Sequence, residues 1–134
     1  MTAIVIDASA LAAYLLHEKG SETVGRYLVE GVDSIELVFK EAASAILTAE
    51  RTGRIDRDQA EVCLEALRTI MGLNVRAAGQ GDLLEESCEV ARKHDTTVYD
   101  AMYVVLAKRL RVKLLTKDEK QAQVAREEGL GIVT

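Results

Sequence analysis

Short apolar runs alternate with helix-like segments along the chain, and this alternation restricts the possible fold more than any other feature. Residues 3–6 form a continuous apolar, β-branched run ending at Asp7, as expected of a strand buried on both faces of a parallel sheet. The pattern predicts an α/β fold, a three-layer sandwich with a mostly parallel central sheet flanked by helices. Further strands are predicted at 34–39, 73–76, 112–116 and 130–133, and helices at 8–16, 20–30, 41–51, 57–71, 82–94, 98–110 and 119–128.

The composition is that of a globular protein, and the length predicts one domain over residues 1–134. No apolar run is long enough to span a bilayer, and residues 1–7 lack the basic region of a signal peptide, which predicts a cytoplasmic protein with no membrane contact. The formal net charge of −5 excludes nucleic-acid binding through bulk charge. A polyanionic partner would need a local basic patch, a bound cation, or both.

The two cysteines, Cys63 and Cys88, lie far apart and follow no metal-ligand spacing. We predict two buried, unreactive thiols. A disulfide between them stays open as the alternative, because intracellular disulfides occur in hyperthermophiles.

Four acidic residues are predicted to lie at one edge of the sheet: Asp7, Glu41, Asp100 and Asp118. Two of them follow predicted strands, and the other two lie in the first turn of predicted helices. In an open parallel sheet, helices begin and ligands bind at the carboxyl ends of the strands. Four converging carboxylates repel one another, so such a site must hold cations or keep some groups protonated. Oxygen ligands without a histidine or cysteine cluster favour Mg²⁺ or Mn²⁺ over zinc.

Each acid also has a structural alternative. Asp7 and Asp118 are suitable N-caps, and Glu41 is a suitable first-turn acid at the positive end of a helix dipole. Thr97 and Asp100 match the capping-box pattern. The apolar side chains of residues 98–107 spread over most of the helix circumference, so this helix is predicted to be buried on several sides. Such a setting favours a cation partner for Asp100.

Four segments resemble, in order and spacing, the motif blocks of the PIN-domain family, and most closely its single-domain VapC-type toxins: IVIDASALAAYLL (4–16), VFKEAASAIL (38–47), TVYDAMYVVLAKRL (97–110) and KLLTKDEKQAQVA (113–125). The resemblance implies a divalent-metal-dependent endoribonuclease, a homodimer, and a small antitoxin protein as partner. A metal-activated water would attack the RNA phosphorus and leave 5′-phosphate and 3′-hydroxyl ends.

The resemblance also implies roles for individual residues. Glu41 would bind a second ion or orient the water. Gln121 departs from the apolar residue expected near that position, a difference that would affect the packing of the last helix and not the chemistry. The catalytic set would be Asp7, Glu41, Asp100 and Asp118, with Asp7, Asp100 and Asp118 as metal ligands and Ser9 and Thr116 as supporting hydroxyls. Lys40 and Lys117 flank site residues and are candidate RNA contacts, with an ordinary solvated lysine as the alternative for each.

The positive charges suggest one candidate RNA surface, made of Lys108, Arg109, Arg111, Lys113, Lys117 and Lys120, although an ordinary solvated face fits this run equally well. The chain has no tryptophan, one phenylalanine and four tyrosines, which argues against a base-stacking platform.

Two other functions compete with a nuclease. Phosphoryl transfer through an aspartate fits poorly, because Asp7 is followed by Ala8 and Ser9. The chain therefore lacks the acidic pair of receiver domains, and it also lacks the D-x-D motif of haloacid-dehalogenase-like phosphatases. A non-catalytic interaction module that keeps the fold is the alternative from a different class. The RNA target, the number of metal ions and the antitoxin's identity are not encoded in any recognisable pattern.

Overall fold

The computed structural model describes residues 3–134, and every predicted strand and helix is found there, most of them with shifted ends. The strands are β1 (Ile4–Ile6), β2 (Val32–Ile35), β3 (Val75–Ala78), β4 (Lys113–Leu115) and β5 (Ile132–Val133). The helices are α1 (Ala8–Leu15), α2 (Ser21–Glu30), α3 (Leu37–Arg51), α4 (Arg57–Leu73), the 3₁₀ turn η1 (Gly81–Leu83), α5 (Leu84–His94), α6 (Val98–Leu110) and α7 (Glu119–Glu127).

The strands form one parallel sheet in the order β3-β2-β1-β4-β5. β1 lies at its centre, where Val5 pairs with Asp33 on one side and Leu114 on the other. This position explains why Ile4, Val5 and Ile6 are all fully buried. The strand order also brings the carboxyl ends of β1, β2 and β4 together at one edge of the sheet.

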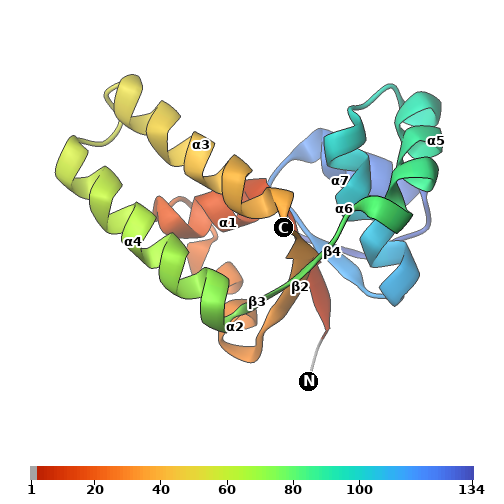
Figure 1. Ribbon diagram of the computed structural model, residues 1–134, viewed down its shortest axis with the longest axis horizontal. Helices are drawn as coiled ribbons and strands as arrows, with labels where there is room; N and C mark the ends of the chain where they lie inside the picture. Colours follow the sequence, from red (N-terminus) through yellow and green to blue (C-terminus); the bar gives the residue numbers. More distant parts are fainter. Residues whose placement is uncertain (1–2) are drawn as a thin grey trace.

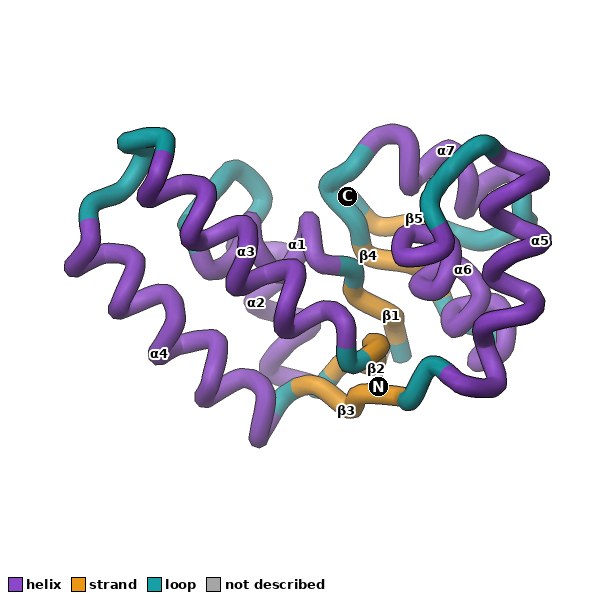
Figure 2. The backbone as a smooth tube through the Cα atoms, turned by 45° about the horizontal axis from the view of Figure 1, so that its top comes forward, coloured by secondary structure: helices purple, strands orange, loops and turns teal. Residues whose placement is uncertain are grey.

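Helices cover the two faces of the sheet and give the predicted three-layer sandwich (Figures 1 and 2). Helices α1 to α4 lie on one side, and α5 to α7 lie on the other. The α3–α4 hairpin extends away from the sheet, at the left of Figure 1. Among residues 3–134 no helix combines the length and the apolar character needed to cross a bilayer.

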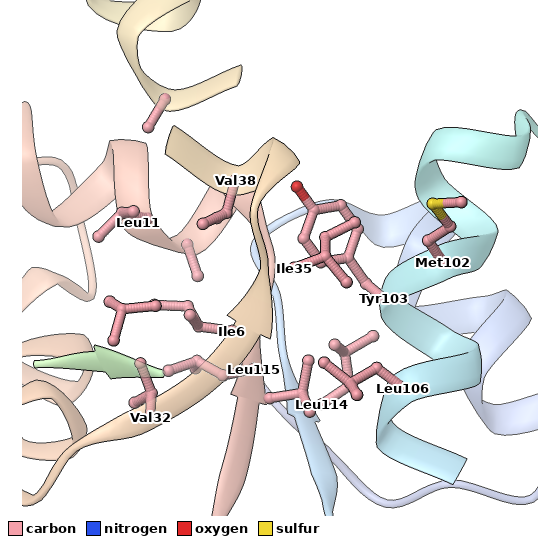
Figure 3. Close-up of a cluster of buried hydrophobic side chains, with 14 of the residues drawn as sticks. Ile6, Leu11, Val32, Ile35, Val38, Met102, Tyr103, Leu106, Leu114 and Leu115 are labelled. Carbon is pink, nitrogen blue, oxygen red and sulfur yellow. The ribbon is translucent and has the colours of Figure 1, made fainter. Parts of the chain in front are cut away.

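The core lies between α6 and the sheet on one side and between α1, α3 and the sheet on the other (Figure 3). Tyr103 and Leu106 of α6 pack towards Ile35 and Leu114, and Leu11 of α1 lies on the opposite side of the strands. All seven residues from Ala101 to Ala107 are buried, so the prediction that this helix is enclosed on several sides is confirmed.

The predicted strand at 34–39 is wrong in its bounds. The strand is Val32–Ile35, and the chain already turns into α3 at Leu37. The buried residues Val38, Ala42 and Ile46 recur every four positions, which is the spacing of a helix and not of a strand. Asp33 fits inside the strand because Arg76, its partner on β3, pairs with its carboxylate through two 3.0 Å hydrogen bonds. As a consequence, Glu41 lies in the second turn of its helix and does not open it.

Two smaller expectations also change. The third strand is Val75–Ala78 rather than 73–76, because α4 continues to Leu73 and Asn74 caps it. Both cysteines are free thiols, so the disulfide alternative is wrong. Cys63 is buried as predicted and donates to the carbonyl of Leu15, whereas Cys88 is only partly buried.

Candidate functional site

A cavity of about 220 Å³ opens at the carboxyl edge of the sheet, and all four predicted acids line it. Asp7 lies deepest and is 3% exposed. Glu41 and Asp100 are half-buried, and Asp118 is exposed at the opening. The remaining wall consists of Ala8, Ser9, Ala12, Ala45 and Tyr103. Side chains from four separate segments of the chain therefore meet at one place.

Asp7 is fixed through both of its carboxylate oxygens. It caps α1 by accepting a 3.1 Å hydrogen bond from the backbone N–H of Ala10, so the predicted N-cap is present. The same oxygen, Oδ1, accepts from the hydroxyl of Ser9 at 2.6 Å, and Oδ2 accepts from the hydroxyl of Thr116. Capping therefore does not remove Asp7 from the cavity, because the cap and the cavity lining use the same carboxylate.

The two hydroxyls also connect Asp7 to the segment that carries Asp118. Ser9 Oγ accepts from the backbone N–H of Lys117 at 2.8 Å, and Thr116 Oγ1 accepts from the N–H of Asp118 at 3.1 Å. Each hydroxyl thus donates to the buried carboxylate and accepts from the loop after β4. Ser9 and Thr116, both expected as supporting residues, hold two walls of the cavity together.

Tyr103 is a cavity residue that we did not identify from the sequence. Its hydroxyl donates to Glu41 Oε1, which joins α6 to α3 across the site, although the ring itself is 1% exposed. Burial, followed by the contact with Glu41, raises the pKa of Tyr103, so the phenol keeps its proton and remains a donor. Tyr103 lies three residues after Asp100 and thus on the same side of α6, a spacing that could have identified it.

Asp100 lies in the first turn of α6, as predicted, and Thr97 caps that helix by accepting from the Asp100 N–H at 3.0 Å. Within residues 3–134, the reciprocal bond from the Asp100 side chain to the Thr97 backbone is not formed; the complete capping box occurs at Asp56 and Gln59 of α4. The capping-box interpretation of Asp100 is therefore only half right, and its carboxylate lines the cavity.

Asp118 caps α7 by accepting from the N–H of Gln121 at 3.1 Å. Gln121, which we expected to affect only the packing of this helix, is 3% exposed and donates from Nε2 to the backbone carbonyl of Asp100 at 2.9 Å. That expectation was incomplete, because Gln121 directly links the two helix starts that carry site acids.

The acids raise one another's pKa values, and burial contributes most. Burial raises the pKa of Asp7 to about 6, even though its hydroxyl and N–H donors oppose the shift. Burial and the nearby charge of Asp100 raise the pKa of Glu41. Burial and the charge of Asp118 raise the pKa of Asp100. Across residues 3–134, none of the four acids forms a salt bridge.

The donor chemistry of this cavity fits a divalent cation. The four carboxylates supply oxygen ligands suited to Mg²⁺ or Mn²⁺, and none of them has a salt-bridge partner within residues 3–134. In the described part of the chain, no three acidic, histidine or cysteine side chains are close enough to form a complete ligand set as they are placed. The exposed and half-buried carboxylates would need to move inward to complete one.

The expected RNA-contacting lysines lie on different parts of the surface. Lys40 is exposed on α3 and lines the groove between α3 and α4, outside the acidic cavity. Lys117 lies next to the cavity, and its side chain crosses Gly20, where a Cβ atom would come within 2.1 Å of Nζ. Gly20 also has a φ of +89°, so a residue without a side chain suits both the backbone and the lysine.

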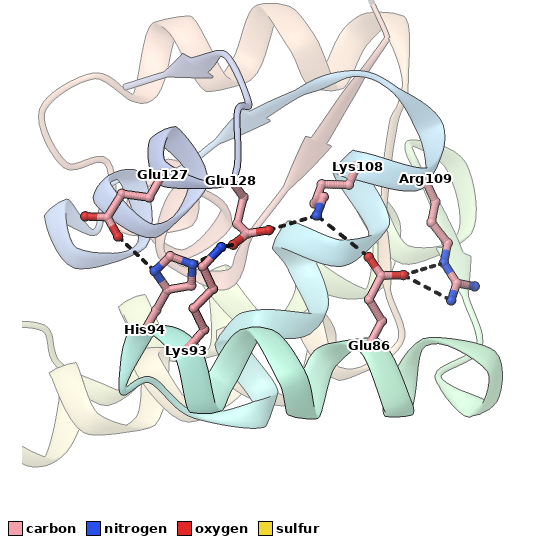
Figure 4. Close-up of polar contacts among 7 residues, drawn as sticks. All are labelled: Glu86, Lys93, His94, Lys108, Arg109, Glu127 and Glu128. Carbon is pink, nitrogen blue, oxygen red and sulfur yellow. Dashed lines mark hydrogen bonds and ion pairs between the residues drawn. The ribbon is translucent and has the colours of Figure 1, made fainter.

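The basic run does not form one free surface. Lys108 pairs with Glu86 and Glu128, and Arg109 pairs with Glu86 (Figure 4). Arg109 also pairs with Asp82. Arg111 and Lys113 lie at the amino edge of the sheet, where they line a hollow of about 700 Å³. This hollow is larger than the acidic cavity, but its lysines and arginine are far from the four acids. We therefore assign the candidate site by its chemistry and not by its volume.

The chain is similar in sequence and in fold to known proteins of one family. The family model described as PIN domain matches residues 4–127. Ribonuclease VapC3 of Pyrobaculum aerophilum is 33% identical over 122 residues, covering 90% of this chain and 92% of that protein. Ribonuclease VapC1 of Mycobacterium tuberculosis is 32% identical over 124 residues, covering 91% and 90%. The crystal structure of PAE2754 from Pyrobaculum aerophilum is similar with a TM-score of 0.72 and 25% identity, covering 98% of this chain and 90% of that one.

Proposed function

Because the chain belongs to the PIN-domain family, we propose that it is a metal-dependent endoribonuclease, the toxin of a toxin–antitoxin pair. The observation that carries this proposal is the convergence of four carboxylates in one cavity, none of them with a salt-bridge partner within residues 3–134. The relatives that cover nine-tenths of the chain are named ribonucleases, which supports RNA as the substrate class.

We assign the metal-holding role to Asp7, Asp100 and Asp118, and the metal is Mg²⁺ or Mn²⁺. When bound, such an ion lowers the pKa of a water molecule and stabilises negative charge on a phosphate. Asp7 is suited to hold it because three donors fix its carboxylate at the base of the cavity. Asp118 is at the opening, where its exposed carboxylate uses Oδ1 to cap α7, so Oδ2 is the oxygen that it would offer to an incoming ion.

Glu41 has a different role in this scheme. The Tyr103 hydroxyl occupies Glu41 Oε1 and leaves Oε2 for a water molecule or a second ion. Its raised pKa brings Glu41 closer to the range in which a carboxylate takes a proton from an attacking water. Ser9 and Thr116 act by orienting Asp7, since neither hydroxyl has a free donor once both carboxylate contacts are made.

RNA contacts come from the rim of the cavity. Lys117 is the stronger of the two lysine candidates, because it belongs to the loop that carries Asp118, whereas Lys40 lies in the α3–α4 groove. Phosphate contacts of this kind position a backbone without reading its sequence. We place this reaction in the cytoplasm, where RNA substrates are available.

The proposed partners are a small antitoxin protein and a second copy of the chain, both implied by the family. The groove between α3 and α4 supports the first, because Phe39, Leu64, Leu67 and Met71 give it an apolar lining suited to an amphipathic helix. Light scattering of the purified chain at several concentrations tests the homodimer, and co-expression with the adjacent small reading frame tests the antitoxin.

The decisive experiment measures RNA cleavage by the wild type and by Asp100→Asn with Mn²⁺ or with EDTA. We expect wild-type cleavage to require the metal and the variant to lose at least about 100-fold in rate, because a carboxylate ligand is removed. The matched control is Asp58→Asn, an exposed first-turn acid of α4 away from the cavity, which should cleave at the wild-type rate.

Two results would contradict the proposal. Cleavage by Asp100→Asn at the wild-type rate would remove the acid cluster from the mechanism. A wild-type chain that folds and binds Mn²⁺ but cleaves no RNA would instead identify a non-catalytic module of the same fold.

A further inference from the structure

Gln121 is a polar residue at a position whose surroundings favour an apolar one. It lies in the first turn of α7, is 3% exposed, and is followed by the buried residues Ala122, Val124 and Ala125. Its side-chain oxygen, Oε1, is fully buried and has no hydrogen-bond partner among residues 3–134. A buried acceptor without a donor destabilises the fold, so an apolar side chain of similar size would satisfy the packing better.

An apolar side chain at this position could not form the hydrogen bond to α6. The Nε2 amide of Gln121 donates to the backbone carbonyl of Asp100 at 2.9 Å, while its backbone N–H donates to Asp118 Oδ1 at 3.1 Å. One residue therefore holds the carboxylate at the start of α7 and the main chain at the start of α6. This bond opposes the repulsion between the two carboxylates, which face the same cavity.

We propose that Gln121 is a positioning residue that sets the separation of Asp100 and Asp118 for a divalent cation. This inference rests on the proposed function, because it needs those two acids to act as ligands. Gln121 itself does not touch the cation or the RNA. Lys120 provides a parallel tie, since its Nζ donates to the Asp95 carbonyl in the loop before α6, but this bond does not hold Asp100.

The test compares Gln121→Met with the wild type in the full chain, using Mn²⁺ alone as the probe. Methionine keeps the length and volume of the side chain but has no amide donor. Calorimetric titration gives the Mn²⁺ affinity without RNA, and thermal unfolding in EDTA gives the metal-free stability. Gln123→Met is the matched control, because Gln123 is exposed on the same helix and its amide donates to Glu127 Oε1, away from the acidic cavity.

We expect Gln121→Met to bind Mn²⁺ about 10-fold more weakly or worse, as is usual when a residue that orients metal ligands is lost. Its unfolding temperature in EDTA should equal or exceed that of the wild type, because the unpaired amide oxygen is gone. Half-maximal RNA cleavage should need correspondingly more Mn²⁺, and saturating Mn²⁺ should restore most of the rate. Gln123→Met should match the wild type in all three measurements.

Unchanged Mn²⁺ affinity in Gln121→Met would overturn the positioning role while leaving the nuclease proposal intact. If that variant does not fold, Gln121→Leu replaces it, and failure of both to fold would also overturn the inference by making Gln121 a structural residue. If the wild type binds no Mn²⁺, the proposed function fails together with this inference.

Discussion

Two groups of carboxylates in this protein have opposite surroundings. At the carboxyl edge of the sheet, Asp7, Glu41 and Asp100 have raised pKa values and no salt-bridge partner within residues 3–134. At the end of α7, Glu127 and Glu128 have lowered pKa values because they lie among cations and donors (Figure 4).

Both carboxylates of the second group have cationic or hydrogen-bonding partners. The carboxylate of Glu128 contacts Lys108 at 2.8 Å and His94 Nε2 at 2.6 Å, with Lys93 at 3.4 Å. The hydrogen bond from Lys108 and that from His94 lower the pKa of Glu128 to about 2. The other ring nitrogen of His94 lies 2.8 Å from Glu127, so this cluster ties the end of α5 to the end of α7.

Glu127 and Glu128 stabilise the fold through their partners, whereas the carboxylates of the acidic cavity remain available to bind a ligand. A chain that needed only structure at the sheet edge would have supplied a lysine or arginine there, as it does around Glu128. The acidic cavity instead keeps its charge uncompensated, at a cost in stability that a bound cation would remove. The comparison can be tested by adding a cation to the acidic cavity and by removing a carboxylate charge from each region.

The largest effect is expected from adding a cation to the acidic cavity. Ala45 lines that cavity one helical turn after Glu41, so Ala45→Lys places an ammonium beside the acids in the favourable Glu-to-Lys order. We expect RNA cleavage to fall at least about 100-fold, because the lysine replaces the divalent ion without its chemistry. Cleavage assays over a range of Mn²⁺ concentrations measure this.

Ala45→Met is the control for that experiment, since it adds a side chain of similar length without charge. Both variants should fold. Equal activity of the lysine and methionine variants would show that the missing positive charge at the cavity has no functional importance.

A smaller effect is expected from removing the deepest charge. An acid with a higher pKa in the folded chain stabilises the fold most when protonated, so the contribution of Asp7 is largest below about pH 4 and is lost as the pH rises through about 6. Asp7→Asn removes this dependence and should stabilise the metal-free protein at pH 8. The difference between the ordinary pKa of 3.8 and about 6 sets an upper limit of about 3 kcal/mol.

Urea unfolding in EDTA at pH 4 and pH 8 measures this change. Asp56→Asn is the control, because Asp56 is another N-cap aspartate but is exposed, and asparagine caps helices equally well. An Asp7→Asn variant that is less stable than the wild type at pH 8 would mean that the hydrogen bonds to the carboxylate outweigh its burial.

The smallest of the three effects is expected from the cation-rich cluster. Glu128 is 7% exposed at its side chain, and Glu128→Gln leaves Lys108 and His94 without their shared partner. We expect a loss of about 2 kcal/mol in unfolding free energy at pH 7, less than for a fully buried pair because Lys108 and Lys93 reach solvent. Since the pKa of Glu128 is lowered, its contribution should persist above about pH 4.5 and fade as the pH drops towards 2.

Glu119→Gln is the matched control on the same helix, where the pair with Arg126 is largely exposed. It should change the stability by less than about 0.5 kcal/mol. RNA cleavage should be unaffected in both variants at temperatures where they remain folded. A loss of cleavage in Glu128→Gln without unfolding would link the two regions, contrary to the contrast drawn between them.

Much of the fold follows from local patterns in the sequence. Ile4–Ile6 form a central strand because three β-branched residues in succession have no polar face to expose. The segment from Val98 to Leu110 forms a helix with the predicted bounds, since Thr97 caps its start. The error at residues 34–39 arose because short apolar runs fit a strand and a buried helix start equally well.

Some features of the candidate site also follow from local sequence patterns, whereas others do not. The sequence by itself determined that Asp7, Asp100 and Asp118 follow strands or begin helices, and parallel strands bring those positions to one edge whatever the details of packing. Only the tertiary structure decided that Tyr103 reaches Glu41 from another helix, that Gln121 joins Asp100 to Asp118, and that Lys108 and Arg109 are already paired. Those contacts join residues distant in the chain through the relative placement of whole helices, and side-chain packing sets that placement without leaving a local pattern.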